Sequence, residues 1–243
     1  MKTKIILAVL LVITTCISAK IKKTVFSEEN YGVNNVGTTV TIQFEQGKEH
    51  NHPLFAIWLA DENGKYIQTL YVSETIGKGV FKRVSRKTGQ WLAGEIQRPA
   101  ALPYWGHQRG IKNEYGNYLP TPKQPVIDAY TGATPLASFI LHAKTEKPLN
   151  GKYKIMLELN QTWDWNEFWT NDMYPTEKEY RTSCQPALVY SVDIDTNDSD
   201  AEYLLKPIGH SHYSGADGSL NTDLSTITTA LQIAKKIIVK ISK

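Results

Sequence analysis

Cysteine is scarce in this chain of 243 residues, which contains only Cys16 and Cys184. Residues 1–19 have the organisation of a secretory signal peptide, and their removal would leave Cys184 without an internal disulfide partner. Long basic blocks are lacking as well. The chain has 27 basic and 24 acidic residues, and removal of Lys2 and Lys4 leaves 25 against 24, a net charge of +1. A disulfide-stabilised fold and nucleic-acid binding are therefore not expected.

Signatures of common catalytic sites are also missing. The sequence contains no Gly-x-Ser-x-Gly nucleophile elbow, no phosphate-binding glycine loop and no His-Glu-x-x-His zinc motif. Beyond the N-terminal segment, no apolar run approaches the roughly 20 residues that a membrane-spanning helix needs. These absences leave open whether the protein is an enzyme, and they favour a carrier or a binding domain over a stand-alone catalyst.

The first 19 residues predict export. Two lysines precede an apolar run from Ile5 to Ile13, and Ile17-Ser18-Ala19 is an acceptable cleavage site, so the mature protein is expected to be periplasmic or secreted. Processing as a lipoprotein at Cys16 is the alternative. Because Thr15 is a poor residue immediately before a lipid-modified cysteine, we favour cleavage after Ala19.

The rest of the chain is dominated by strand patterns. Residues 20–36 read as a linker or an edge segment, and residues 37–243 as one domain. Val40, Ile42 and Phe44 alternate with polar residues, and Asp61-Glu62-Asn63-Gly64 predicts a hairpin turn. The predicted strands are Thr38–Phe44, Phe55–Leu59, Tyr66–Tyr71, Ser138–His142, Tyr153–Leu159, Ala187–Ile194 and Glu202–Leu205, with residues 228–241 either strand or partly helix. This pattern predicts an all-β, immunoglobulin-like antiparallel β-sandwich.

Two insertions interrupt the strands, near residues 77–125 and 161–186. The first contains a short segment, Ser85–Leu92, that could form a helix. The second is rich in tryptophan and also carries Asp164, Glu167 and Asp172. Connections of this length are usually functional or packed insertions, and aromatic residues beside acids suit a glycan site. An immunoglobulin-like binding module for a glycan or a protein is therefore one candidate function.

The segment Asp128-Ala129-Tyr130-Thr131-Gly132-Ala133-Thr134 reads D-x-x-[ST]-G-A-[ST]. Thr134 supplies a hydroxyl that could attack a pyrophosphate phosphorus. Gly132 and Ala133 add little bulk beside it, and Gly132 permits a positive φ. Pro135 favours an extended conformation at Thr134, so we expect the threonine on an exposed, non-helical loop. The alternative is an ordinary Thr-Gly turn between two strands.

This segment resembles the acceptor motif of FMN transferases of the ApbE type. These enzymes split FAD and leave FMN joined through its phosphate to the last Thr or Ser of the motif. The resemblance implies covalent FMN at Thr134, with Asp128, Thr131, Gly132 and Ala133 forming the rest of the recognised site.

Three further segments resemble a family of periplasmic domains of unknown function. They are the string from His52 to Val72, the Arg-Pro-Ala-Ala-Leu-Pro-x-Trp run from Arg98 to Trp105, and the Gly-His-x-His segment from Gly209 to His212. The resemblance implies an immunoglobulin-like fold and an association with PepSY-type membrane redox proteins and ApbE-type flavin transferases. The function it implies is that of an exported flavoprotein that passes electrons to an extracytoplasmic acceptor.

A tethered flavin would need an aromatic surface and a cation nearby. The aromatic candidates are Tyr130, Trp105, Trp163, Trp165 and Trp169, each of which could instead serve as a packing residue. Lys123 is a candidate partner for the phosphate, although it could equally be an ordinary solvated lysine.

Histidines suggest a third candidate function, that of a metal-binding protein. His210 and His212 would face the same side of a strand and could bind Zn, Cu or Fe with His107 or Asp217 as a further ligand. The alternative is a loop whose histidines bond to the backbone, since the spacing specifies no third ligand.

Overall fold

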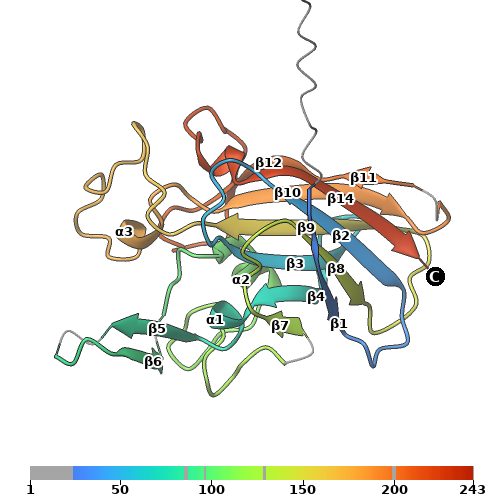
Figure 1. Ribbon diagram of the computed structural model, residues 1–243, viewed down its shortest axis with the longest axis horizontal. Coiled ribbons are helices and arrows are strands. Elements are labelled where there is room, and N and C mark those ends of the chain that lie inside the picture. Colours follow the sequence, from blue (N-terminus) through green and yellow to red (C-terminus); the bar gives the residue numbers. More distant parts are fainter. Residues whose placement is uncertain (1–23, 85–86, 96, 128–129, 199–200, 243) are drawn as a thin grey trace, which may run out of the picture.

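The structure is a computed structural model that describes residues 24–84, 87–95, 97–127, 130–198 and 201–242. The predicted signal peptide, Cys16, Asp128 and Ala129 lie outside the described residues. Most of the strands in the described part of the chain belong to two β-sheets that pack face to face (Figure 1). The prediction of an all-β sandwich is therefore confirmed at the level of its architecture.

The smaller sheet has five strands in the order β1-β8-β2-β14-β11. These strands are β1 (Ser27–Tyr31), β2 (Thr39–Gln46), β8 (Phe139–Lys144), β11 (Tyr203–Leu204) and β14 (Ala234–Ser242). β1 pairs in parallel with β8 at one edge, so the segment predicted as a linker or edge contributes an edge strand. Residues 228–241 contain both predicted alternatives, because the short 3₁₀ helix η2 (Ala230–Gln232) precedes β14.

The larger sheet has seven strands in the order β13-β12-β10-β9-β3-β4-β7. They are β3 (Leu54–Asp61), β4 (Tyr66–Ser73), β7 (Thr131–Gly132), β9 (Lys152–Asn160), β10 (Leu188–Asp195), β12 (Lys206–Ser211) and β13 (Leu220–Asn221). The predicted hairpin joins β3 to β4, and its turn uses Gly64 at φ 87°. A positive φ costs glycine little, which explains the residue at this turn.

The main core lies between the sheets. The alternating residues Val40, Ile42 and Phe44 of β2 are fully buried there. They face Phe55 and Ile57 of β3, and the Phe44 and Phe55 rings meet edge-on with their centroids 5.1 Å apart. The two-residue period of strands thus directs one face of each sheet inward.

A second core covers the outer face of the seven-stranded sheet. Trp58 of β3, Met156 of β9 and Val189 of β10 point away from the main core and pack beneath Leu102 and Trp105. Leu102 is the N-cap of α2 (Pro103–Arg109) and Trp105 lies in its first turn, where Pro103 at the first position needs no backbone donor. The insertion near residues 77–125 is therefore a third layer of the molecule.

This third layer also contains α1 (Glu74–Gly77) and a hairpin of β5 (Val80–Val84) with β6 (Trp91–Glu95). In Figure 1 the hairpin projects beyond β4 and β7. A short helix near Ser85–Leu92, which the sequence allowed, is not formed by the described residues of that segment, because Trp91 and Leu92 pair in β6. The tryptophan-rich insertion contributes the single-turn helix α3 (Tyr180–Ser183).

Candidate functional site

Thr134 follows the short edge strand β7, which pairs in parallel with the end of β4. The registered pairs are Val72 with Thr131 and Ser73 with Gly132. Thr134 is therefore non-helical, as predicted, but it is half-buried rather than fully exposed. Its hydroxyl donates a hydrogen bond of 3.1 Å to Oγ of the buried Ser73. A hydroxyl that donates in this way keeps its lone pairs, which a nucleophile requires.

Tyr71 holds the backbone just before Thr134. Its hydroxyl lies 3.3 Å from the carbonyl oxygen of Gly132 and 3.1 Å from that of Ala133, and it donates to this pair of acceptors. Burial raises the pKa of Tyr71, so the phenol stays protonated and remains a donor throughout the ordinary pH range. The acceptor segment is thereby fixed to the sheet.

Gly132 is explained by close packing and not by backbone conformation. Its φ is not positive, which corrects the expectation from the sequence. A Cβ at this position would lie 1.7 Å from the hydroxyl oxygen of Tyr31, whose ring meets Tyr71 edge-on at 5.0 Å. Burial raises the pKa of Tyr31 to about 12. The absence of a side chain at Gly132 therefore lets β1 cover the acceptor segment.

Thr134 and Ala133 line a cleft of about 670 Å³. This volume falls in the range of about 300–1,000 Å³ that is usual for ligand sites. Leu54, Val80 and Phe81 supply apolar walls, while charged groups also line the cleft: Glu74, Lys78 and Arg98. Glu74 and Lys78 form an ion pair of 2.9 Å across one turn of α1.

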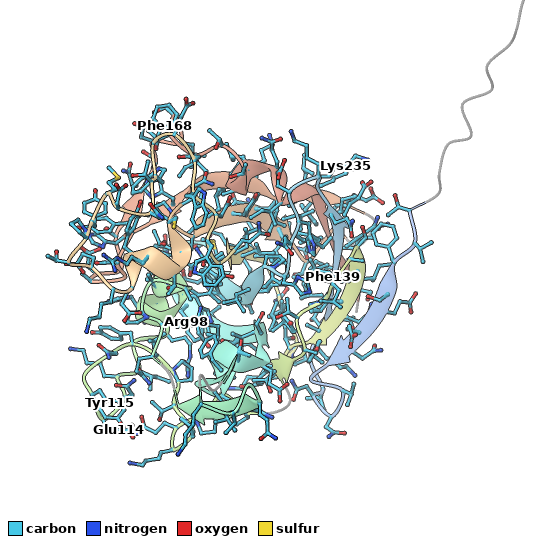
Figure 2. All side chains as sticks on the ribbon, turned by 60° about the vertical axis from the view of Figure 1, so that its left-hand side comes forward. Arg98, Glu114, Tyr115, Phe139, Phe168 and Lys235 are labelled. Carbon is cyan, nitrogen blue, oxygen red and sulfur yellow. The ribbon has the colours of Figure 1, made fainter. Side chains whose placement is uncertain are left out.

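Arg98 is the most informative residue of the cleft. Its guanidinium lies over the Phe81 ring at 4.6 Å from the centroid, a cation–π contact. Figure 2 shows Arg98 between the segment that carries α3 and the β5–β6 layer. Its Nε is buried and has no hydrogen-bond partner among the described residues. Burial lowers the pKa of Arg98 while the nearby Glu179 opposes that effect, and an arginine stays charged regardless. An unpaired buried donor of this kind calls for an acceptor.

The other partners predicted for a flavin lie elsewhere. Trp105 is fully buried and Tyr130 nearly so, and both belong to the second core. Tyr130 donates to Glu146 at 3.1 Å and accepts from Asn35 at 3.0 Å. Lys123 pairs with Glu114 at 3.4 Å and is not among the residues that line the cleft.

The three remaining aromatic candidates belong to the tryptophan-rich insertion. Trp169 packs against the main core, whereas Trp163 and Trp165 are exposed and line a different hollow. The Thr134 cleft is instead lined by the rings of Phe81 and His52. Sequence reasoning missed both Phe81 and Arg98, although Arg98 stands out as the single charge before the apolar run that ends at Trp105.

The histidines proposed as metal ligands hydrogen-bond to backbone carbonyls or to a serine. His107 Nδ1 lies 2.8 Å from the carbonyl of Pro103, and the buried His210 Nδ1 lies 2.8 Å from that of Ser211. His212 bonds to Ser214 at 3.2 Å. Hydrogen bonds from Ser219 lower the pKa of the Asp217 carboxyl, and the nearby His212 and His107 lower it further. Across the described part of the chain, no three His, Cys, Asp or Glu side chains are grouped so that they could hold a metal ion.

Comparisons with known proteins add no relative: no family model, no curated protein and no solved structure matched the chain. Within the described residues, none of the helices has the length and apolar character needed to cross a membrane. The site must therefore be interpreted from its own geometry.

Proposed function

We propose that this protein is an exported electron-transfer flavoprotein that carries FMN on Thr134. An ApbE-type transferase would attach the flavin, and a PepSY-type membrane redox protein would exchange electrons with it. The terminal acceptor would be ferric iron or another extracytoplasmic oxidant. The observation that carries the proposal is the placement of Thr134 on a cleft that Arg98 also lines, a cation whose buried Nε has no hydrogen-bond partner among the described residues.

Attachment requires one substitution at phosphorus. A bond forms between Oγ1 of Thr134 and the phosphorus of the FMN half of FAD, and the pyrophosphate bond to the AMP half breaks. AMP leaves with the electron pair, and the threonine proton passes to a base of the transferase. Because Tyr71 fixes the carbonyls of Gly132 and Ala133, this chain contributes a positioned nucleophile.

The side chains of the cleft fit the attached group. The tether keeps one negative charge on its phosphate, and a guanidinium is the side chain best suited to such oxyanions. Phe81, Leu54 and Val80 offer apolar contacts to a planar ring system. The flavin would supply the electron chemistry, while these residues would set its exposure and the charge around it.

The predicted compartment gives the tether a purpose. A freely dissociating FMN would be diluted and lost outside the cytoplasm, and a covalent bond to Thr134 avoids this loss without a deep binding pocket. The signal-like residues 1–19 support export.

We also propose that the sandwich is immunoglobulin-like in its central strands. The neighbours β10-β9-β3-β4 and β8-β2 follow the order of strands G-F-C-C′ and E-B in that fold. Two edges depart from it. The C-terminal β14 lies beside β2 where a first strand would be, and β1 runs parallel to β8.

Intact mass measurement tests the flavin directly. The protein isolated from its native host, or coexpressed with a matching transferase, should be yellow and heavier by one FMN less one water. Thr134→Ala should lose this mass, whereas Thr134→Ser should keep it because serine is also an acceptor.

Thr162→Ala is the matched control, since Thr162 is another threonine that lines the same cleft. It should keep the added mass. A native protein without flavin, or a Thr134→Ala variant that still carries it, would refute the proposal.

A further inference from the structure

The tryptophan-rich insertion presents aromatic rings to solvent. Trp163 is 67% exposed and Trp165 is 52% exposed, and Phe168 lies nearby in sequence at 45%. Tryptophan is highly buried in most proteins, so two neighbouring exposed indoles need an explanation. Figure 2 shows Phe168 at the outer edge of the molecule, well away from Arg98.

The backbone that presents these rings is strained. Trp163 has φ 59° and Cys184 has φ 63°, a region that bulky residues rarely occupy. Such conformations cost about 1–3 kcal/mol each and tend to occur at functional sites. Because the Trp163 indole is largely exposed, its burial contributes little to offset this cost.

Backbone hydrogen bonds between residues 163–164 and residues 182–185 hold the strained residues in place. The amide of Trp163 donates to the carbonyl of Thr182 at 2.9 Å, and the amide of Gln185 donates to that of Asp164 at 3.0 Å. The Asp164 carboxylate accepts from the hydroxyl of Thr229, and burial raises the pKa of that carboxyl. The indoles are therefore attached to an ordered segment.

The Asn166 side chain connects the turn that follows Trp165 to the segment before β14. Its side-chain nitrogen donates to the hydroxyl of Thr228 and to the carbonyl of Thr226, both at 2.8 Å. Its side-chain oxygen accepts from the amide of Trp169 at 2.7 Å. A surface that is already ordered in the free protein loses less entropy when a ligand binds.

The two indoles line a shallow hollow of about 480 Å³ together with Asn171, Asp172 and Arg181. These polar groups are an amide, a carboxylate and a guanidinium. Asp172 already accepts from the Thr170 hydroxyl and Arg181 donates to the Pro175 carbonyl, and each still has further atoms that can bond a hydroxyl. Trp163 and Trp165 are the exposed neighbours of the buried Asp164. The hollow thus combines flat apolar surfaces with planar hydrogen-bonding groups.

We propose that this hollow binds a neutral oligosaccharide. A pyranose ring has an apolar C–H face that packs on an indole, and its equatorial hydroxyls would reach the amide, carboxylate and guanidinium. A shallow, open hollow suits a segment of a longer glycan, which lies across a surface. The site shares no lining residue with the Thr134 cleft, so it does not depend on the flavin proposal.

Titration of the mature protein with neutral oligosaccharides tests this site. The panel contains β-1,4-linked hexasaccharides of glucose, xylose, mannose and N-acetylglucosamine, followed by tryptophan fluorescence and calorimetry. At least one should give a saturable change in indole emission. Trp163→Ala and Trp165→Ala should each weaken that binding about tenfold or more, as for a central aromatic anchor.

Phe168→Ala is the matched control, because Phe168 is an exposed aromatic residue of the same insertion that does not line the hollow. It should bind like the wild type, and so should Thr134→Ala. Equal thermal stability of all variants would separate lost binding from unfolding. The proposal is overturned if no member of the panel binds saturably, or if binding survives in the Trp163→Ala, Trp165→Ala double variant. Capture of a protein by these indoles without sugar binding would also overturn it.

Discussion

At the scale of single residues, Glu158 of β9 is the most unusual side chain. It is fully buried on the outer face of the seven-stranded sheet, and its two carboxyl oxygens accept the backbone amides of Tyr104 at 3.1 Å and Trp105 at 2.7 Å. Burial raises the pKa of Glu158 to about 8, against the lowering effect of these amide bonds. The carboxyl group is therefore protonated in the folded protein over a range where the unfolded chain has released its proton.

Glu158→Gln should flatten the pH dependence of stability. The raised pKa means that the folded wild type binds more protons than the unfolded chain between its ordinary value of 4.5 and about 8. Its free energy of unfolding should therefore fall as pH rises through this window, by up to about 1.4 kcal/mol per pH unit. Urea denaturation at pH 5 and pH 8 measures the change.

Glutamine has nearly the same shape but does not titrate, so the variant should lose most of this slope. The control is Glu202→Gln, because Glu202 is an exposed surface partner of Lys240 and its removal should leave the slope in place. An unchanged slope in Glu158→Gln would assign the pH dependence to other groups.

At the scale of elements, the third layer removes the alternation of apolar and polar residues from the strand that it covers. Six consecutive residues of β3, Phe55 to Ala60, are buried because the sandwich core covers one face of the strand and α2 covers the other. The run therefore lacks the alternation that β2 shows. Trp105 connects the layers, since it is fully buried and its indole N–H donates to Thr69 at 3.1 Å.

Trp105→Ala should destabilise the fold by about 3–5 kcal/mol, because it leaves a large cavity between α2 and the sheet. Trp165→Ala, which removes an indole that is half in solvent, should change the free energy of unfolding by no more than about 0.5 kcal/mol. Chemical denaturation of both variants compares them. Similar losses would mean that α2 contributes little to the folded state.

The strands could be predicted from the sequence wherever apolar residues alternate with polar ones, form a run of strand length, or stand beside a diagnostic turn residue. β2, β8, β9, β10 and the hairpin of β3 with β4 fall in this group. The hairpin of β5 with β6 could not be predicted, because part of its sequence is equally compatible with a short helix. The pairing of the two strands decides between these structures. The same limit applies to the site. Thr134 could be named from its motif, but Arg98 and Phe81 reach the cleft through tertiary packing alone.

At the scale of the whole molecule, each proposed site includes residues of one insertion, and the Thr134 cleft lies where the first insertion meets the sandwich. The cleft beside Thr134 is completed by Phe81 and Arg98 of the third layer, and the indole hollow belongs to the segment between β9 and β10. The sandwich serves as a rigid support for both. Binding of a group in the cleft should consequently stabilise the junction between the sheet and the third layer.

Melting of protein with and without attached FMN measures this coupling. A charge-assisted bond from Arg98 to the phosphate would add about 1.5–3 kcal/mol, and each kcal/mol corresponds to about 2–4 °C in a chain of this size. The flavin should therefore raise the melting temperature by several degrees. Arg98→Ala should remove most of this rise without preventing attachment at Thr134.

Lys123→Ala provides the matched comparison, because Lys123 is a cation that pairs with Glu114 outside the cleft. This variant should keep the full rise in melting temperature. If Arg98→Ala keeps it as well, the flavin does not occupy the cleft.

The sequence by itself determined the class of fold and singled out the Thr134 hydroxyl as the proposed flavin acceptor. Both follow from local information: a two-residue period, turn residues with defined conformations, and a short motif that ends at Thr134. Only the tertiary structure decided what surrounds that hydroxyl, why Gly132 must lack a side chain, and which tryptophans are buried. These properties depend on contacts between residues distant along the chain, such as Gly132 with Tyr31 and Arg98 with Phe81, which no local pattern encodes.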